Sequence, residues 1–383
     1  MATLKAVIGA NYGDEGKGHI VDYLTYMAAK PCIVVCTNGG AQRGHTVCTQ
    51  EHGQHIFHHF GSGTFAGADT YLPKQFIMNP MIFAQEYQEL RWQNFTVYAD
   101  PNCLVSTPYD MIVNQIIEER RGTKKHGSCG VGIWETILRN EATIGELYLK
   151  NNDELYDYLK GVRDTYFMTR LKSKGIEVPK RWADVYFSYN LIMHYIQDFR
   201  FMMEHVKLTD ASFLKAYRSI IFENGQGLML DQNIQDSAHS TPSNTGSKDI
   251  RNMVKEVFDD TVPIEVCYVT RTYATRHGAG ELSNEVGADY FMLNTSTETN
   301  VWNKNQGVFR YGRLEIEDLD ARCTNDFNTY WDDYNLAQMS YAITHLDERI
   351  FKTAELVKDK KFYSSVGPNR HNILEAIYSS PWR

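Results

Sequence analysis

The first thirty residues hold the pattern that most constrains the fold of this chain. Residues 4–10 read Leu-Lys-Ala-Val-Ile-Gly-Ala, a short aliphatic run that is typical of a buried strand. Glycines follow at positions 13, 16 and 18, and the apolar residues after them recur at the spacing of a helix. The pattern therefore predicts a strand, a glycine loop and an amphipathic helix from Gly18 to Ala29.

The rest of the chain repeats this alternation of strand and helix patterns. Further strands are expected at residues 32–37, 217–223, 264–270, 340–346 and 362–365. Helical periodicity dominates residues 147–162 and 182–206. We predict an α/β fold with a mostly parallel central sheet, a P-loop-like glycine loop and a helical insertion. The chain is expected to form a single domain, 1–383, with a mainly helical subdomain at about 141–217.

Composition excludes several classes of partner. The net charge of −8 argues against a surface that neutralises nucleic-acid phosphates or anionic lipids. No run approaches the roughly 20 apolar residues of a membrane helix, and the N-terminal residues lack the pattern of a secretory signal. We therefore expect a cytoplasmic protein that binds neither nucleic acid nor membrane. The seven cysteines include no Cys-x-x-Cys pair, which indicates reduced thiols.

The glycine loop has a chemical meaning of its own. Glycines between a strand and a helix expose backbone N–H groups at the positive end of the helix, and Lys17 adds a charge for phosphate. The loop departs from the common P-loop, because Asn11 replaces its first glycine and Gly18 follows Lys17 where Ser or Thr is usual. A turn that only permits tight packing stays open as the alternative.

Seven segments, in order along the chain, resemble the motifs of the adenylosuccinate synthetase family. The family reads Gly-Asp-Glu-Gly-Lys-Gly, Gly-Gly-x-Asn-Ala-Gly-His-Thr, Phe-Glu-Gly-Ala-Gln-Gly, Val-Thr-Ser-Ser-Asn-Thr, Ser-Thr-Arg-Val-Gly-Ala-Gly, Thr-Lys-Leu-Asp and Ser-Thr-Gly-Pro. The corresponding segments here are 13–18, 39–46, 222–227, 240–245, 273–280, 344–347 and 365–368. Their joint order is far more specific than any single motif.

The resemblance implies a ligase that uses GTP, L-aspartate and IMP, with Mg²⁺, and works as a homodimer. GTP would phosphorylate O6 of the purine, and the amine of aspartate would then displace the phosphate. Asp14 matches the base for the purine N1 proton and, with the carbonyl of Gly44, a magnesium ligand. His45 matches the histidine whose imidazolium stabilises charge on O6. Lys17 matches a catalytic, phosphate-binding lysine.

The resemblance also assigns binding residues. For GTP they are Gly13, Glu15, Gly16, Gly18, His345, Asp347, Ser365 and Gly367. For the purine monophosphate they are Cys129, Gly130, Arg139, Gln226 and Thr241. Arg139 would reach the phosphate across a dimer interface, with a solvated arginine at a helix end as the alternative. For the aspartate carboxylates we expect Arg310, since arginine clamps a carboxylate with two bonds, and Thr299 as a supporting hydroxyl.

Several departures from the family pattern leave alternatives open. Gln42 and Arg43 replace Asn-Ala, Cys129 replaces a threonine, and His345 replaces a lysine. The arginine-rich loop of the family keeps only Arg310 and Arg313, which makes the deoxyribonucleotide dGMP an alternative acceptor. An inactive GTP-binding regulator is a further alternative.

A histidine-rich segment offers a weaker metal hypothesis. His55, His58 and His59 lie close together in the sequence, but strand alternation would divide them between two faces and their spacing matches no regular set of ligands. We therefore expect no metal there.

Overall fold

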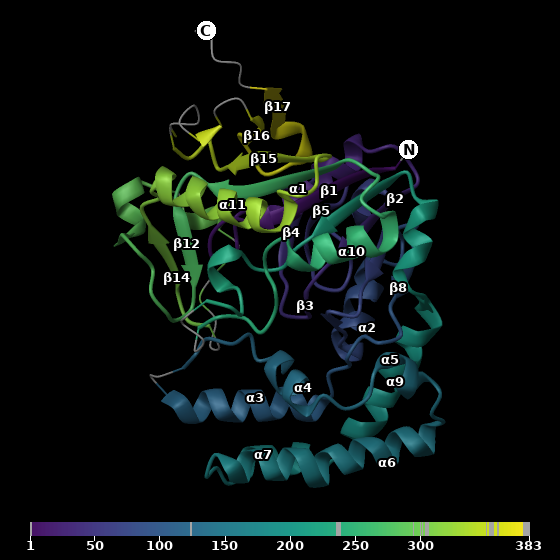
Figure 1. Ribbon diagram of the computed structural model, residues 1–383. Helices are drawn as coiled ribbons and strands as arrows, with labels where there is room; N and C mark the ends of the chain where they lie inside the picture. The colour runs from purple at the N-terminus through teal and green to yellow at the C-terminus, as the bar shows by residue number, and fades with distance from the viewer. Residues whose placement is uncertain are drawn as a thin grey trace, which may run out of the picture.

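A ten-stranded sheet forms the centre of the protein (Figure 1). The computed structural model describes residues 2–122, 125–234, 239–293, 295–298, 300, 302, 306–349, 351, 356–357 and 360–377. In spatial order the strands are β17 (Ile373–Ile377), β16 (Lys361–Ser365), β15 (Ala337–Thr344), β11 (Ile264–Arg271), β1 (Thr3–Gly9), β10 (Ser219–Glu223), β2 (Cys32–Cys36), β6 (Asp69–Leu72), β8 (Val97–Ala99) and β9 (Val206–Leu208). All neighbours pair in parallel except β16 and β17. The predicted α/β fold with a mostly parallel sheet is confirmed.

The centre of the sheet is covered on both faces, as its aliphatic sequence requires. Along β1, Leu4, Ala6 and Ile8 belong to one buried cluster and Val7 to another, because successive side chains point to opposite faces. Helix α1 (Lys17–Met27) covers the Val7 face, and α10 (Lys248–Phe258) and α11 (Ile316–Trp331) cover the other. The predicted strand, loop and helix unit is therefore present at the middle of the molecule.

Most of the remaining helices lie together below the sheet in the view of Figure 1. They are α2 (Pro80–Leu90), α3 (Pro108–Arg121), α4 (Ile133–Arg139), α5 (Ile144–Tyr148), α6 (Asn152–Val162), α7 (Met168–Ser173), α8 (Lys180–Tyr186) and α9 (Tyr189–His205). One buried cluster joins all of them except α4 to the sheet, from Val97 of β8 to Phe199 of α9. Among the described residues, no helix combines the length and apolarity needed to cross a bilayer.

Each of the two helices expected from the sequence in this region is divided into two shorter helices. The helix expected over 147–162 is interrupted before Asn152, because the Asn151 side chain accepts from the backbone N–H groups of Asp153 and Glu154 and so starts a new helix. The helix expected over 182–206 consists of α8 and α9, and it ends in β9, which pairs with β8. A three-residue strand gives too short a pattern to be recognised in the sequence.

The parallel strands place their following loops at one edge of the sheet. The loops after β1, β2, β10, β11 and β15 contain the segments beginning near Ala10, Thr37, Asn224, Thr272 and His345. Shorter strands extend these loops: β3 (Gly39–Gly40), β4 (His45–Thr49), β5 (Gly53–Phe57), β7 (Phe76–Ile77), β12 (Ala274–His277), β13 (Glu285–Val286) and β14 (Phe309–Gly312). In a parallel sheet this edge is where ligands bind.

Candidate active site

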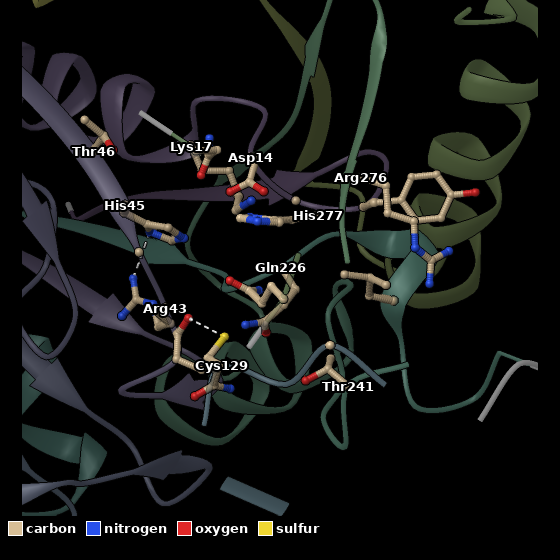
Figure 2. A pocket seen from close by; sticks show the side chains of 18 of the residues that line it. Asp14, Lys17, Arg43, His45, Thr46, Cys129, Gln226, Thr241, Arg276 and His277 are labelled. Carbon is tan, nitrogen blue, oxygen red and sulfur yellow. Dashed lines mark hydrogen bonds between the residues drawn. The ribbon is translucent and has the colours of Figure 1, made fainter. Parts of the chain in front are cut away.

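One large cavity opens at this edge of the sheet, with a volume of about 1130 Å³. Of the predicted site residues, its wall includes Gly13, Asp14, Gly16, Lys17, Gly18, Gly44, His45, Cys129, Gly130, Gln226, Thr241, His345, Asp347, Ser365 and Gly367. Figure 2 shows that the Asp14, His45 and Gln226 side chains come from separate segments and face a common space. The fold therefore brings together residues that lie more than 300 positions apart in the sequence.

The Glu15 carboxylate stabilises the glycine loop through hydrogen bonds from the loop backbone. Its Oε1 accepts hydrogen bonds from the N–H groups of Asn11 and Gly13, both at 2.9 Å, and its Oε2 lies 3.1 Å from Lys17 Nζ. The Glu15 side chain is buried and does not line the cavity. This carboxylate holds the loop and Lys17 in place, so a contact of Glu15 with GTP would involve its backbone and stays a prediction.

Helix α1 starts directly at the cavity. Its first residues, Lys17 and Gly18, both line the wall, so the positive end of the helix faces the space where a phosphate would bind. Gly18 is needed for packing, because a Cβ there would lie 2.9 Å from the Cβ of His45. The start of the helix and the His45 strand are thus in direct contact.

Asp14 has both an unusual backbone and an unusual electrostatic environment. Its φ of +60° lies in the left-handed region, which few residues other than glycine adopt. Burial raises the pKa of its carboxyl group above the ordinary value, although Lys17 and Arg271 oppose this shift. A carboxylate with a raised pKa is a stronger base, which suits the predicted role.

Arg271 is a residue that the sequence analysis missed. It ends β11, and its Nε donates to the carbonyl of Asp14 at 2.7 Å while Nη1 bonds Glu298 at 2.7 Å. Arg271 also lines the cavity. Its position directly after an aliphatic strand, at the carboxyl edge of the sheet, was the signal that could have identified it.

His45 belongs to a buried network that includes Glu223 and Arg43. Its Nδ1 lies 2.6 Å from Glu223 Oε1 and 3.1 Å from Arg43 Nη2, and Arg43 lies 2.9 Å from Glu223 Oε2. The backbone N–H of Ser62 donates to Glu223 Oε2 at 3.1 Å, and the Ser62 hydroxyl donates to Oε1. Glu223 was missed as a functional residue because its motif was read only for Gln226.

Burial and the contacts within this network shift the pKa values of Glu223 and His45. Burial alone would raise the pKa of Glu223, but Arg43 and His45 hold it well below its usual range. Burial lowers the pKa of His45 to about 4, with Arg43 acting in the same direction and Glu223 against it. His45 is therefore neutral near pH 7 in this structure, and the imidazolium expected from the resemblance requires a negative charge nearby, as a bound phosphate would supply.

The part of the cavity expected to hold the purine nucleotide is lined by Gln226, Thr241 and the turn containing Cys129. The buried Oε1 of Gln226 has no hydrogen-bond partner among the described residues, so it can accept from a ligand. Burial raises the pKa of the Cys129 thiol to about 11, which keeps this group neutral. A neutral thiol is a weaker hydrogen-bond donor than the hydroxyl of a threonine.

The segments expected to hold GTP are tied to the glycine loop. Thr344 Oγ1 donates to the carbonyl of Glu15 at 2.8 Å, and His19 Nε2 lies 2.9 Å from Ser365 Oγ. His345 adopts a φ of +60° and its Nδ1 lies 2.9 Å from Thr344 Oγ1. Both far segments of the chain are thereby held against the start of α1.

The structure does not bring Arg139 to the cavity. Its guanidinium forms two bonds to the Asp110 carboxylate, at 3.0 and 2.9 Å, and its other hydrogen bonds go to the carbonyls of Val105 and Glu141 and to the Tyr158 hydroxyl. The side chain is 1% exposed. Within one chain Arg139 joins α4 to α3, since a buried guanidinium needs these partners. Its reach across a dimer interface to a phosphate stays a prediction.

The Arg310 side chain also binds protein groups outside the cavity. It forms an ion pair with Glu285 and donates to the carbonyls of Gly278 and Gly280, at 3.0 and 2.8 Å, without lining the cavity. Arg310 thus supports the 278–280 turn in this structure, and its role as the aspartate clamp stays a prediction. Thr299, the other predicted aspartate contact, lies outside the described residues.

Two other basic residue types, an arginine and a histidine, line the cavity on the side of Asp14. Arg276 and His277 both belong to β12, and the charge of His277 contributes to lowering the pKa of Asp14. Figure 2 shows the His277 ring close to the Asp14 carboxylate. The family motif has Val at position 277, and this difference was visible in the sequence but not used.

The magnesium prediction fits the oxygen atoms present. Asp14 and Gly44 both line the cavity, and Mg²⁺ prefers a carboxylate or carbonyl together with phosphate oxygens to a complete protein cage. The described residues contain no cluster of three or more His, Cys, Asp or Glu side chains suited to a metal. The histidines near β5 bind protein groups instead: His58 Nδ1 donates to the Ala41 carbonyl at 3.1 Å, and His59 Nε2 accepts from the Asn79 N–H at 2.9 Å.

The comparisons with known proteins agree with these motifs. A family model described as adenylosuccinate synthetase matches residues 6–308. The adenylosuccinate synthetase of Gloeothece citriformis is 30% identical over 298 residues, which are 73% of this chain and 63% of that protein. That of Borrelia duttonii is 26% identical over 298 residues, 74% of this chain and 65% of that protein. The matches thus span less than two thirds of the length of these relatives.

Two solved structures share the fold over nearly the whole chain. The fully ligated adenylosuccinate synthetase of Plasmodium falciparum superposes with a TM-score of 0.72 at 17% identity, covering 97% of this chain and 99% of that one. The succinoaminodeoxyadenylate synthetase of cyanophage S-2L, bound to dGMP and to dATP as an energy donor, gives 0.66 at 14% identity, covering 98% and 95%. With the matched sequence model and the motifs gathered around one cavity, these findings show that the chain belongs to the adenylosuccinate synthetase family.

Proposed function

We propose that this protein is a GTP-dependent ligase that joins L-aspartate to C6 of IMP and forms adenylosuccinate. One observation carries the proposal: a single cavity connects the glycine loop with Asp14 and Lys17, the His45 network, Gln226, and the distant Asp347. Its volume of about 1130 Å³ is large enough for more than one small ligand. Family membership supports the reaction class.

In the first step, the Asp14 carboxylate takes the proton from purine N1. The electron pair then resides on O6, which attacks the γ-phosphorus of GTP, and GDP leaves as the O6–P bond forms. The N–H groups at the start of α1 and the Lys17 ammonium face the phosphates, whose charge they balance. The raised pKa of Asp14 favours the proton transfer.

In the second step, the amine of aspartate attacks C6 and inorganic phosphate leaves with O6. His45 would stabilise charge on O6 through Nε2, since its Nδ1 is held by Glu223. When bound, magnesium would neutralise charge on the phosphoryl oxygens, with Asp14 and the Gly44 carbonyl as its protein ligands. We assign the aspartate carboxylates to the β12 side of the cavity, because Arg276 and His277 line the wall there and Arg310 does not. The Arg276 guanidinium also donates to the Glu281 carbonyl at 2.6 Å.

The acceptor dGMP is the second candidate, and one observation favours it. Neither Arg310 nor Arg313 lines the cavity, so the arginine that the family uses for the ribose 2′-hydroxyl has no counterpart at those positions. The cyanophage protein that shares this fold binds dGMP. IMP stays the first candidate because Asp14, the base of the IMP enzymes, is present at the cavity wall.

The test offers IMP and dGMP in parallel to the purified protein with GTP, Mg²⁺ and aspartate. We expect a succinyl nucleotide from IMP, detected by mass, with one phosphate released for each product. Product from dGMP alone would overturn IMP as acceptor and leave the ligase class intact. Aspartate-independent or absent phosphate release with both nucleotides would refute the enzyme and favour a GTP-binding regulator.

The nucleotide donor is tested in the same assay by replacing GTP with ATP. We propose that Asp347, which lies exposed on the cavity wall, accepts from N1 and N2 of guanine, and adenine offers no such pair of donors. Turnover should therefore fall with ATP, and equal turnover would contradict this role. The homodimer and the cytoplasmic location are proposed from the family resemblance alone.

A further inference from the structure

Arg43 is a fully buried cation beside the proposed catalytic histidine. Its side chain is 0% exposed, as is that of Glu223, and the two form an ion pair at 2.9 Å. The family motif has alanine at this position, so the chain carries a guanidinium where a methyl group is usual. A buried charge is costly unless it is paired, which means that Arg43 depends on Glu223.

A second departure from the family motif provides the space for Arg43. Position 225 is glycine here and alanine in the family motif, and a Cβ at Gly225 would lie 3.2 Å from Arg43 Cγ and 3.5 Å from Cδ. The Gly225 backbone does not need glycine for its conformation, since its φ is not in the left-handed region. The two differences from the family therefore occur at two positions that touch each other.

Glu223 is held by contacts on both of its oxygens. Oε2 accepts hydrogen bonds from the Arg43 guanidinium and the Ser62 N–H, and Oε1 accepts them from His45 Nδ1 and the Ser62 hydroxyl. Because the Glu223 carboxylate can only accept, the proton of His45 must lie on Nδ1. Arg43 Nη2 lies 3.1 Å from this protonated Nδ1 and therefore donates its hydrogen bond to Glu223. This arrangement leaves Nε2 for the cavity.

We propose that Arg43 is a positioning residue that fixes the Glu223 carboxylate and, through it, holds His45 as the Nδ1–H tautomer with Nε2 available to the cavity, and that Gly225 is its matched partner. This inference rests on the proposed function for its kinetic part, but the tautomer of His45 is independent of any activity. Outer contacts of this kind orient a functional histidine, and their loss typically lowers activity about 10- to 100-fold.

The kinetic test compares the wild type with Arg43→Ala, Arg43→Lys, Gly225→Ala and the double variant R43A/G225A, which restores the family pair. We expect Arg43→Ala to lower kcat about 10- to 100-fold while KM for GTP and the acceptor changes by less than about threefold. Arg43→Lys should recover part of kcat because it keeps the charge. Gly225→Ala should lower kcat when Arg43 is present and have little effect when Arg43 is absent.

The tautomer test uses ¹⁵N NMR of the histidine side chains, with the His45 signals assigned by their absence in His45→Gln. The wild type should show Nδ1 protonated and Nε2 unprotonated, and Arg43→Ala should show a mixture of tautomers. This measurement stands even if the wild type turns over no nucleotide, so a failure of the proposed function and a failure of this inference are distinguishable.

Three results would overturn the inference. They are a kcat of Arg43→Ala within twofold of the wild type, an unchanged His45 tautomer in that variant, or the same effect of Gly225→Ala in both backgrounds. If Arg43→Ala fails to fold, Arg43→Lys decides: one ammonium cannot reproduce the guanidinium geometry, so kcat should fall at constant KM. Unchanged kcat and tautomer in Arg43→Lys would also overturn it.

Discussion

At the residue scale, the backbone conformation of Asp14 determines where its carboxylate lies, and this place determines the pKa of the carboxyl group. The left-handed backbone, with a φ of +60°, places the carboxylate on the cavity wall beside Lys17 and Arg271. Strained conformations of this kind persist where the surrounding structure enforces them, often at functional sites. Here the contacts that hold the conformation include the hydrogen bond from Arg271 to the Asp14 carbonyl and the hydrogen bond from the Gly13 N–H to the Glu15 carboxylate.

Asp14→Asn tests the base directly. Asparagine also tolerates a positive φ and has nearly the same shape, so the loop should keep its structure. Removing a general base typically lowers a rate about 10²- to 10⁴-fold, and we expect kcat to fall by that amount. GTP affinity, measured by calorimetry without the acceptor, should be largely retained. Turnover equal to the wild type would refute the role of Asp14.

At the scale of elements, contacts between helices explain what the sequence analysis did not foresee for Arg139. Arg139 stands at the end of α4, where an arginine is typically solvated, but α4 packs on α3 and the side chain pairs with Asp110. Asp110 itself caps α3 by accepting from the Thr107 N–H at 2.7 Å. The pairing depends on how two helices meet, which no local pattern contains.

Arg139→Met should therefore change stability and leave phosphate binding intact. Breaking a buried ion pair by removing one partner costs about 3 to 5 kcal/mol, measured here as the free energy of unfolding in urea. The control R139M/D110N carries no buried charge and should recover part of this loss. If Arg139→Met instead raised KM for the acceptor at unchanged stability, Arg139 would contact the phosphate after all.

Helix α2 is joined to the β5 region through the buried carboxylate of Glu86. Glu86 accepts from the N–H groups of His58 and His59, both at 2.8 Å, and His58 in turn holds the loop that contains Arg43. Burial opposes ionisation, but His55 and His59 lower the pKa of Glu86 to about 2. This side chain therefore connects the loop that leads to His45 with the helical side of the molecule.

Glu86→Gln gives a prediction for the pH dependence of stability. A pKa lowered from 4.5 to about 2 contributes stability that is complete above pH 4.5 and is lost as the pH falls toward 2. The variant should be less stable than the wild type by about 1.5 to 3 kcal/mol at pH 7, as expected for hydrogen bonds to a charged group. The difference between the two unfolding free energies should shrink below pH 4.5. A constant difference would contradict the lowered pKa.

At the scale of the whole molecule, the sequence was sufficient for six of the ten strands of the sheet and for most of the cavity, whereas β6, β8, β9 and β17 were not predicted. The strands at 32–37 and 264–270 and the glycine loop were correct because each is a local pattern, and the edge of a parallel sheet then collects their loops. The partners that Glu15, Arg139 and Arg310 have within the chain were not foreseen, because sequence spacing does not record these contacts.

We also propose that the helices belong to the same domain as the sheet. One buried cluster contains residues of β8 and of α3, α6 and α9, so the helical region has no separate core among the described residues. This arrangement supports a single domain with a helical subdomain. It also places the Cys129 turn, which lies between α3 and α4, across the cavity from the glycine loop.

The proposed reaction transfers phosphate to purine O6 before the amine of aspartate attacks C6. IMP labelled with ¹⁸O at O6, incubated with the protein, GTP, Mg²⁺ and aspartate, tests this claim by mass spectrometry of the products. We predict one ¹⁸O atom in the released inorganic phosphate for each adenylosuccinate formed, because the O6–C6 bond breaks when the amine attacks. Adenylosuccinate formed together with unlabelled phosphate would contradict the account.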